Sequence, residues 1–401
     1  MKSAVRFVPV LAGSVLAVGG AALLMAASIG SLHPEALTVH EWGTFTSIAG
    51  DDGMAIDWEP LDGPSDLPCF VHRFEVGAKA LLSGTVRMET PVIYLYGPEG
   101  STANVRVSFP KGFITEWYPK ANRVATFIGS GIPPRGPNVR QPGKEEPDSI
   151  EWPAVKLQRD SDAIDFPLEQ PPSHYYAGRR TDSDALLVGS DVEKFLFYRG
   201  VGRFQPPIAA VAGAGDRIVV RDLSPTQIPA AILFQNHDGK ISYRVSGPIG
   251  AEVTVEIPQA AANIGTLRAD LESILISQGL FAKEAKAMVA TWGDSWFEEG
   301  TRLFYFLPTS VVDSLLPLEV RPVPPHVARV FVGRMEIFTP TMKREIRDAI
   351  ARGDSSVFAK YGRFLNPVTA GINPNAWWSG QVSAMRQKYL GRQTACGKSA
   401  W

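Results

Sequence analysis

The sequence predicts a β-rich α+β protein, in which an antiparallel β-sandwich-like domain precedes a helical hairpin and a smaller α+β part. Three observations predict this fold. Short strand-like segments recur until about residue 258, separated by turns that use many of the 37 Gly and 32 Pro residues. Helical periodicity then replaces them, and strand-like segments return before the chain ends. We expect the sandwich-like domain at 31–260, the hairpin with the α+β part at 261–366, and an irregular tail at 367–401.

Composition limits the classes of function. The 401 residues are 45% hydrophobic and 20% charged, which is enough apolar surface for the cores of two domains. The formal net charge is -1 and no long basic run occurs, which argues against nucleic acid as a partner. Phosphate-binding and dinucleotide glycine motifs are absent from the sequence, so we expect no cofactor. The two cysteines, Cys69 and Cys396, either pair in an oxidising compartment or remain thiols.

The N-terminus has the pattern of an export signal. Lys2 and Arg6 precede an apolar run from Phe7 to Gly30, and small residues near its end offer a cleavage site. The run also approaches the roughly 20 residues of a membrane span. Range 1–30 is therefore a cleaved signal peptide or an anchor in the inner membrane, and we expect membrane contact only through an uncleaved anchor. In both cases the remaining chain is expected to be periplasmic or extracellular.

Strand patterns fill most of the range 31–260. The segment "TVHEWGTFTSI" alternates, and "PVIYLY" is apolar on both sides, which is typical of a buried central strand. An Asp-Gly turn in "QNHDGKIS" indicates a hairpin. The proline-rich insertion at 131–153 interrupts these strands and is expected to form an exposed loop.

Helical spacing appears after residue 261. Leucine and isoleucine recur every three or four residues at 267–275, and a second helix is expected at 282–292, each followed by glycine. Strands return between residues 302 and 337. Thr339 and Pro340 then mark the start of another helix, which should end before Gly353.

Several segments resemble an uncharacterised family of exported bacterial proteins. They are "METPVIYLYG", "TEWYP", "EKFLFYRGVG", "TWGDSWFEEGTRLFYFLP" and "RVFVGRMEIFTP", and that family opens with a similar "VHEWGTFT". The resemblance covers most of the chain after the apolar N-terminus. It implies that these segments belong to one fold, and it carries no activity, substrate or catalytic residue.

His40 and Glu41 raise the question of a metal site. Zinc proteases place a second His four residues after the first, but Thr44 stands there. None of the six His residues has another at ligand spacing, so we predict no metal site. On a strand His40 and Glu41 point to opposite faces, which leaves Glu41 as the functional candidate. The first partner to check for Glu41 is Arg199, which ends the apolar strand of "KFLFYRG" and needs a carboxylate or an anion; Glu89 and Glu116 are the other carboxylates that could pair with it.

The segment "TWGDSWFEEGTR" is the densest polar and aromatic cluster. In a helix, Asp294 and Glu298 share one face, and Ser295 and Glu299 share another. Carboxylates between aromatic rings are what a glycan-cleaving site uses. Alternatively, Ser295 and Glu298 form a capping box that only starts a helical turn. The candidate catalytic residues are Glu41, Asp294, Glu298 and Glu299.

A second loop, "SHYYAGRR", offers aromatic and basic side chains for a ligand. The candidate ligand-binding residues are Tyr175, Tyr176, Arg179, Arg199, Trp292 and Trp296. We expect an exported binding or structural protein whose partner is an extracellular glycan or protein. The alternative is a hydrolase that cleaves an extracellular polymer, such as a glycan, through paired carboxylates.

Overall fold

The computed structural model describes residues 34–61, 67–74, 82–124, 147–159, 163–170, 173–213, 217–258, 260–372 and 376–390. Strands account for 41% and helices for 24%, which confirms a β-rich α+β fold. The apolar run at 1–30 and the insertion up to residue 146 lie outside the described residues. Within the described ranges, no helix has both the length and the apolarity that crossing a membrane requires.

The largest sheet has nine strands in the order β14-β13-β16-β18-β1-β3-β10-β5-β2. Its centre is β1 (Thr38–Ile48), which pairs in parallel with β18 (His326–Ile337) and antiparallel with β3 (Val86–Tyr96). Strands from both sides of residue 260 therefore share one sheet, and the division into parts at that residue stays a prediction.

The remaining strands complete this sheet and two smaller ones. The nine-stranded sheet also contains β2 (His72–Arg73), β5 (Gly112–Tyr118), β10 (Leu196–Gly202), β13 (Ala231–His237), β14 (Lys240–Ser246) and β16 (Gly300–Phe306). A six-stranded sheet contains β4 (Thr102–Phe109), β6 (Asn122–Val124), β7 (Asp148–Gln158), β8 (Ala185–Val188), β9 (Asp191–Glu193) and β17 (Leu318–Arg321). The third sheet contains β11 (Ile208–Ala212), β12 (Arg217–Asp222) and β15 (Glu252–Glu256).

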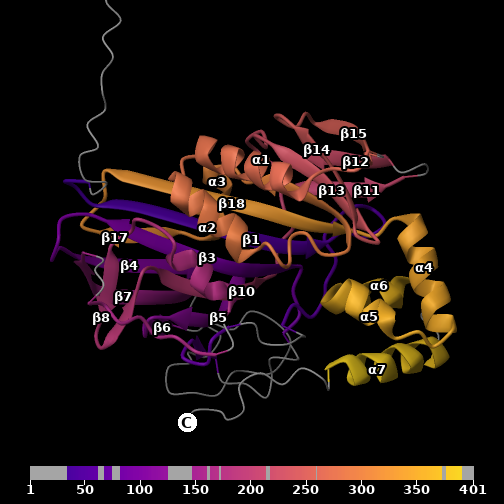
Figure 1. Ribbon diagram of the computed structural model, residues 1–401, viewed down its shortest axis with the longest axis horizontal. Helices are drawn as coiled ribbons and strands as arrows, with labels where there is room; N and C mark the ends of the chain where they lie inside the picture. The colour runs from indigo at the N-terminus through magenta and orange to yellow at the C-terminus, as the bar shows by residue number, and fades with distance from the viewer. Residues whose placement is uncertain are drawn as a thin grey trace, which may run out of the picture. The chain divides into compact units, whose positions relative to one another are not determined.

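The two faces of the nine-stranded sheet contact different partners. One face shares a core with the six-stranded sheet, in which Val39 and Phe45 of β1 lie with Val105 and Trp152. The other face lies under two consecutive helices, α1 (Ile264–Ser277) and α2 (Ala282–Thr291), as periodicity predicted. Figure 1 shows these helices lying across the strands. Because side chains alternate along a strand, each strand supplies both cores.

Four further helices form a third core together with the end of β1. They are α4 (Pro340–Ala351), α5 (Ser356–Tyr361), α6 (Leu365–Ile372) and α7 (Ala376–Leu390), and they lie together in Figure 1. The hydroxyl of Thr339 caps α4 by accepting from the Met342 N–H, as the Thr-Pro signal predicted. Three shorter elements are also helical. They are the α-helix α3 (Thr309–Leu315) and the two 3₁₀ helices η2 (His174–Arg179) and η3 (Gly362–Phe364).

Two sequence-based expectations are corrected here. The tail predicted to be irregular contains α6 and α7. Trp378, Val382 and Met385 recur at helical spacing in α7 and are buried, although polar residues between them hide the pattern. The end of the insertion at 131–153 belongs to β7 and not to a loop. A register shift in the β4–β7 pairing and a positive φ of 56° at Ala154 accommodate Pro153 inside that strand.

Candidate functional site

His40 and Glu41 lie on opposite faces of β1. His40 Nδ1 is 2.8 Å from the carboxylate of Glu284 on α2, and that carboxylate also accepts from Tyr96 Oη at 2.6 Å. The Phe281 backbone N–H donates to the same Glu284 at 2.8 Å, which caps the start of α2. The described residues contain no group of three His, Cys, Asp or Glu that could hold a metal ion. His40 therefore links β1 to α2 through its contact with Glu284.

Glu41 is fully buried on the face shared with the six-stranded sheet. Its carboxylate accepts from Tyr198 Oη at 2.5 Å and from Arg329 Nε at 2.6 Å. The guanidinium of Arg329 also donates to Asp313 at 2.7 Å. The expectation that Arg199 is the partner of Glu41 is wrong. Because neighbours alternate along β10, Tyr198 points to the side of Glu41 and Arg199 to the other.

The segment at 292–299 forms turns instead of the helix considered from the sequence. Trp292 and Trp296 are buried in the core below α1 and α2, with their ring centroids 6.5 Å apart and nearly parallel. The two tryptophans therefore pack against protein and offer no exposed platform for a sugar ring.

The carboxylates of this turn do not pair with one another. They contact three different basic side chains: Asp294 contacts His174, Glu299 contacts Lys360, and Glu298 contacts Arg334. Asp294 and His174 also line an open cavity of about 600 Å³ beside α1 and α2. The expectation that Asp294 and Glu298 share one face of a helix is therefore wrong, because the chain forms turns between these two residues.

The loop predicted to bind a ligand forms η2 and makes internal contacts. Arg179 donates through two nitrogens to Glu193, at 2.8 and 2.7 Å, and Tyr175 Oη donates to the same carboxylate at 3.0 Å. Tyr176 lies under the Arg179 guanidinium, 4.7 Å from its ring centroid. Burial raises the pKa of Glu193, although Arg179 acts in the opposite direction. These contacts hold the loop against β9, which contains Glu193.

A cluster of polar side chains covers part of the helix-facing side of the nine-stranded sheet. We call these residues the arginine cluster: Thr44, Thr46, Arg87, Glu89, Arg199, Arg302, Arg334 and Glu336. All of them are buried, and they come from the adjacent strands β16, β18, β1, β3 and β10. Arg199, a candidate from the sequence, belongs to the cluster. Glu298, another candidate, contacts the cluster through Arg334.

The strand register places these side chains next to one another. Thr46 lies opposite Arg334 on one side and opposite Arg87 on the other, and Thr44 lies opposite Glu89. Paired residues on neighbouring strands point to the same face and lie about 5 Å apart. The two hydroxyls of β1 therefore lie between a guanidinium of β18 and the charged groups of β3.

Arg334 is the most connected member of the cluster. Its Nε donates to Glu336 at 2.6 Å and its Nη2 donates to Glu298 at 2.5 Å. Burial lowers the pKa of Arg334, but the surrounding carboxylates outweigh this effect and hold it above its ordinary value. Phe364 of η3 covers the guanidinium, with its ring centroid 5.0 Å away. Arg334 is thus charged and held in one orientation.

Several buried atoms of the cluster have no hydrogen-bond partner within the described part of the chain. Those on the paired strands β1 and β18 are Thr44 Oγ1, Thr46 Oγ1 and Arg334 Nη1. Buried polar atoms are nearly always hydrogen-bonded, and an unmade bond costs about 1–3 kcal/mol. Hydroxyl and guanidinium groups can all donate. The arrangement therefore offers three donors on one face to acceptor oxygens.

The lowered pKa of Glu89 reflects the positive electrostatic potential at this site. Burial alone would raise its pKa, but four guanidinium groups lower it to about 2. One of them is Arg363 of η3, whose Nη2 donates to Glu89 at 2.5 Å. A carboxylate is thus stabilised in its ionised form inside the protein, so the site favours negative charge.

Glu89 should make the stability of the protein depend on acid pH. Its folded pKa of about 2 is below the 4.5 of an unperturbed Glu, so its contribution is present above pH 4.5 and is lost as pH falls through 2. We expect this group to account for about 3 kcal/mol of unfolding free energy between those limits. Urea unfolding from pH 5 to 2 measures it. Glu89→Gln should flatten the dependence, exposed Glu99→Gln should not, and equal slopes would contradict the assignment.

Sequence reasoning missed Thr44, Thr46, Arg334 and most of the cluster. A signal was present, because the tripeptide Arg-Met-Glu occurs in both β3 and β18, at 87–89 and at 334–336. In each case a buried Met points to the apolar core and the two charged residues point to the other face. Paired charges at alternating positions of apolar strands therefore indicate this kind of site.

Comparisons with known proteins leave the family open. No protein-family model matches the chain, and no curated protein matches it. Among solved structures, the yeast delta-COP-I mu-homology domain matches 75% of this chain and 97% of its own, with 8% identity and a TM-score of 0.29. The same domain complexed with a Dsl1 WxWxV peptide matches 75% and 98%, with 8% identity and a TM-score of 0.28. Scores this low do not establish a shared fold, and we draw nothing from them.

Proposed function

We propose that this protein is an exported binding protein whose arginine cluster holds the anionic group of a ligand. The observation that carries the proposal is the set of three unused donors, Thr44 Oγ1, Thr46 Oγ1 and Arg334 Nη1, on one face of adjacent strands. A carboxylate, sulfate or phosphate group supplies several acceptor oxygens at once and forms strong hydrogen bonds with a guanidinium. The lowered pKa of Glu89 supports the same sign of charge.

Access to the cluster is from the side of Glu298. The Glu298 side chain is 40% exposed, whereas Arg334, which it contacts, is buried. Arg363 and Phe364 of η3 cover the neighbouring part of the cluster. The ligand's anionic group enters beside Glu298, and the remainder of a larger ligand stays outside. An anionic sugar or an acidic peptide of the extracytoplasmic space fits this geometry.

Export is part of the proposal. Its first support is the basic start and apolar run of the N-terminus, which is typical of a signal peptide or an anchor. Its second support is that Cys69 is disulfide-bonded, since disulfides persist in oxidising compartments. The sequence has one other cysteine, Cys396, which lies outside the described residues. In the same proposal, the nine- and six-stranded sheets form the sandwich-like body around their shared core.

Hydrolysis of an extracellular polymer remains the alternative proposal. It needs two carboxylates that face one substrate, with one of them protonated. Glu41 is bound to Arg329, and Glu298 is bound to Arg334, on opposite faces of the sheet. No contact in the described residues favours a carboxylate pair, so we rank binding first.

Titration calorimetry with small anions tests the binding proposal. Acetate, sulfate, phosphate and glucuronate are each titrated at constant ionic strength, with chloride and neutral glucose as controls. We expect at least one oxyanion to bind with one site per chain, while glucose does not bind. Saturation should also raise the melting temperature, because the ligand binds the folded state. If no oxyanion binds with a Kd below about 10 mM at neutral pH, the proposal is wrong.

A further inference from the structure

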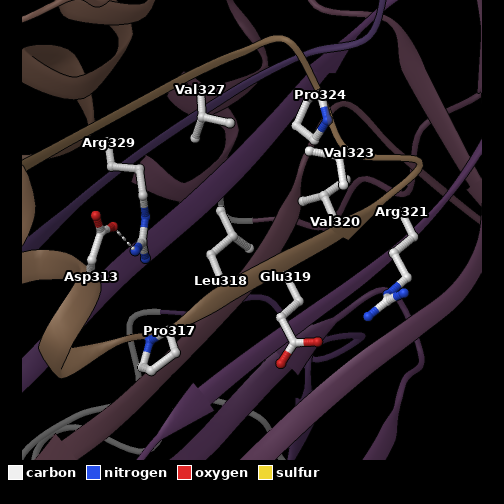
Figure 2. Close-up of a pocket in the computed structure, with 10 residues that line it drawn as sticks. All are labelled: Asp313, Pro317, Leu318, Glu319, Val320, Arg321, Val323, Pro324, Val327 and Arg329. Carbon is white, nitrogen blue, oxygen red and sulfur yellow. Dashed lines mark hydrogen bonds and ion pairs between the residues drawn. The ribbon is translucent and has the colours of Figure 1, made fainter.

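A groove that contains no residue of the arginine cluster lies between β17 and the start of β18. Figure 2 shows this groove, which has a volume of about 550 Å³. Its surface is mostly apolar, and two of its residues are exposed to an unusual degree, Val323 at 84% and Val327 at 50%. At its inner end, the Arg329 guanidinium is already bound to Glu41 and Asp313. The groove thus exposes aliphatic side chains beside a neutralised charge.

One side of the groove is the edge of β17, the terminal strand of the six-stranded sheet, with which no described strand pairs on that side. The Ser108 N–H donates to the Pro317 carbonyl, which defines the hydrogen-bonded positions of the β4–β17 ladder. In an antiparallel ladder these positions alternate, so Glu319 and Arg321 bond to β4. The backbone N–H and C=O groups of Leu318 and Val320 therefore point away from β4, towards the groove.

The opposite side of the groove is the start of β18, which among the described strands pairs there with β1 alone. The Ala49 N–H donates to the Glu336 carbonyl, so even-numbered residues of β18 bond to β1. Odd-numbered residues point the other way, where β16 pairs with β18 only from Val332 onwards. The backbone N–H and C=O groups of Val327 and Arg329 consequently point away from β1 and towards the groove. Two strand edges with outward-pointing N–H and C=O groups thus border one apolar recess.

We propose that this groove binds an extended peptide segment of another protein, which adds as a strand to the edge of β17. Unpaired N–H and C=O groups at a strand edge are complementary to another strand and to little else. Figure 2 shows Leu318 and Val320 extending towards Val327 and Val323, with Glu319 and Arg321 on the other side of β17.

The side chains of β17 define the chemistry of that segment. On the inner side, Leu318 and Val320 face the valines, so the peptide presents β-branched or other aliphatic residues there. On the outer side, Glu319 and Arg321 are exposed two residues apart. Opposite charges stabilise cross-strand pairs, so the peptide carries a basic and an acidic residue at the matching positions. The partner segment therefore alternates aliphatic and charged residues.

Display selection with hydrogen exchange tests this proposal on the full-length protein. A library of random nine-residue peptides is selected on the wild type, and bound complexes are analysed by amide exchange. We expect enriched peptides with the alternating pattern, and slower exchange of the Leu318 and Val320 amides in their complexes. Leu318→Pro removes one groove-facing N–H that β4 does not use, and it should weaken binding at least 10-fold.

Val323→Asp is the second variant, because its exposed side chain is not needed for folding, and it should also weaken binding at least 10-fold. Exposed Leu168→Asp, outside the groove, is the matched control and should bind as the wild type does. The proposal is overturned if no peptide is enriched, or if enriched peptides bind both groove variants as tightly as the wild type. Protection of Leu318 and Val320 that rises with protein concentration alone would overturn it too, since a second copy would then be the occupant.

Discussion

Replacing Arg329 with methionine is expected to lower the free energy of unfolding by about 3–5 kcal/mol, which is the usual cost of leaving a buried charge without its partner. The Glu41 carboxylate is fully buried, and Arg329 Nε at 2.6 Å is its only cation among the described residues. Tyr198 Oη would remain as a donor to Glu41, but a neutral hydroxyl does not compensate a buried negative charge. Urea unfolding followed by tryptophan fluorescence measures the loss.

A matched control separates the ion pair from the loss of one arginine side chain. Arg321→Met changes an exposed residue of the same region and should alter stability by less than about 0.5 kcal/mol. Combining Glu41→Leu with Arg329→Met should restore part of the loss, since no buried charge is then left alone. A loss below about 1 kcal/mol for Arg329→Met would show that the pair is not the buried, charged contact described here.

Replacing Arg334 with glutamine should weaken binding of the anion about 100-fold, the largest effect expected for any residue of the arginine cluster. A hydrogen bond to a charged group contributes about 1.5–3 kcal/mol, and Arg334 supplies both the charge and the unused Nη1 donor. The measurement is calorimetric titration with the oxyanion that binds the wild type most tightly. Arg321→Gln, which changes an exposed arginine outside the cluster, should leave the affinity unchanged.

Thr46→Val distinguishes binding from stability, because Arg334→Gln also releases two carboxylates from their partner. Valine has nearly the shape of threonine and lacks the hydroxyl. In the unliganded protein the Thr46 hydroxyl has no partner among the described residues, so its removal should leave stability unchanged or raise it. Affinity for the anion should nevertheless fall about 10-fold. A Thr46→Val protein that is less stable and binds equally well would contradict the role assigned to this hydroxyl.

Local patterns in the sequence predicted many of the individual elements. Alternation predicted β1, helical spacing predicted α1 and α2, and the Thr-Pro pair predicted the start of α4. Alternation also separated His40 from Glu41 correctly. These successes share one cause, which is that each pattern acts within a few residues of the chain.

Such local patterns do not predict which strands pair with one another. The parallel pairing of β1 with β18 joins residues almost 300 positions apart, and no local period encodes it. For this reason Arg329 was not foreseen as the partner of Glu41, and Arg334 was not placed beside Thr46. The prediction for the segment at 292–299 was wrong for a different reason. Its two tryptophans are core residues, and its carboxylates contact basic side chains on different elements, Arg334 on β18 and Lys360 on α5.

The central claim is that the arginine cluster holds an oxyanion, and anomalous diffraction from crystals soaked in selenate tests it most directly. Selenate carries four acceptor oxygens around a strong anomalous scatterer. We predict an anomalous peak beside β1, with selenate oxygens about 2.7–3.2 Å from Arg334 Nη1 and Thr46 Oγ1. Crystals of Thr46→Val should show a weaker peak at the same place. Selenate bound only elsewhere, with water alone against these donors, would show that the arginine cluster does not hold an oxyanion.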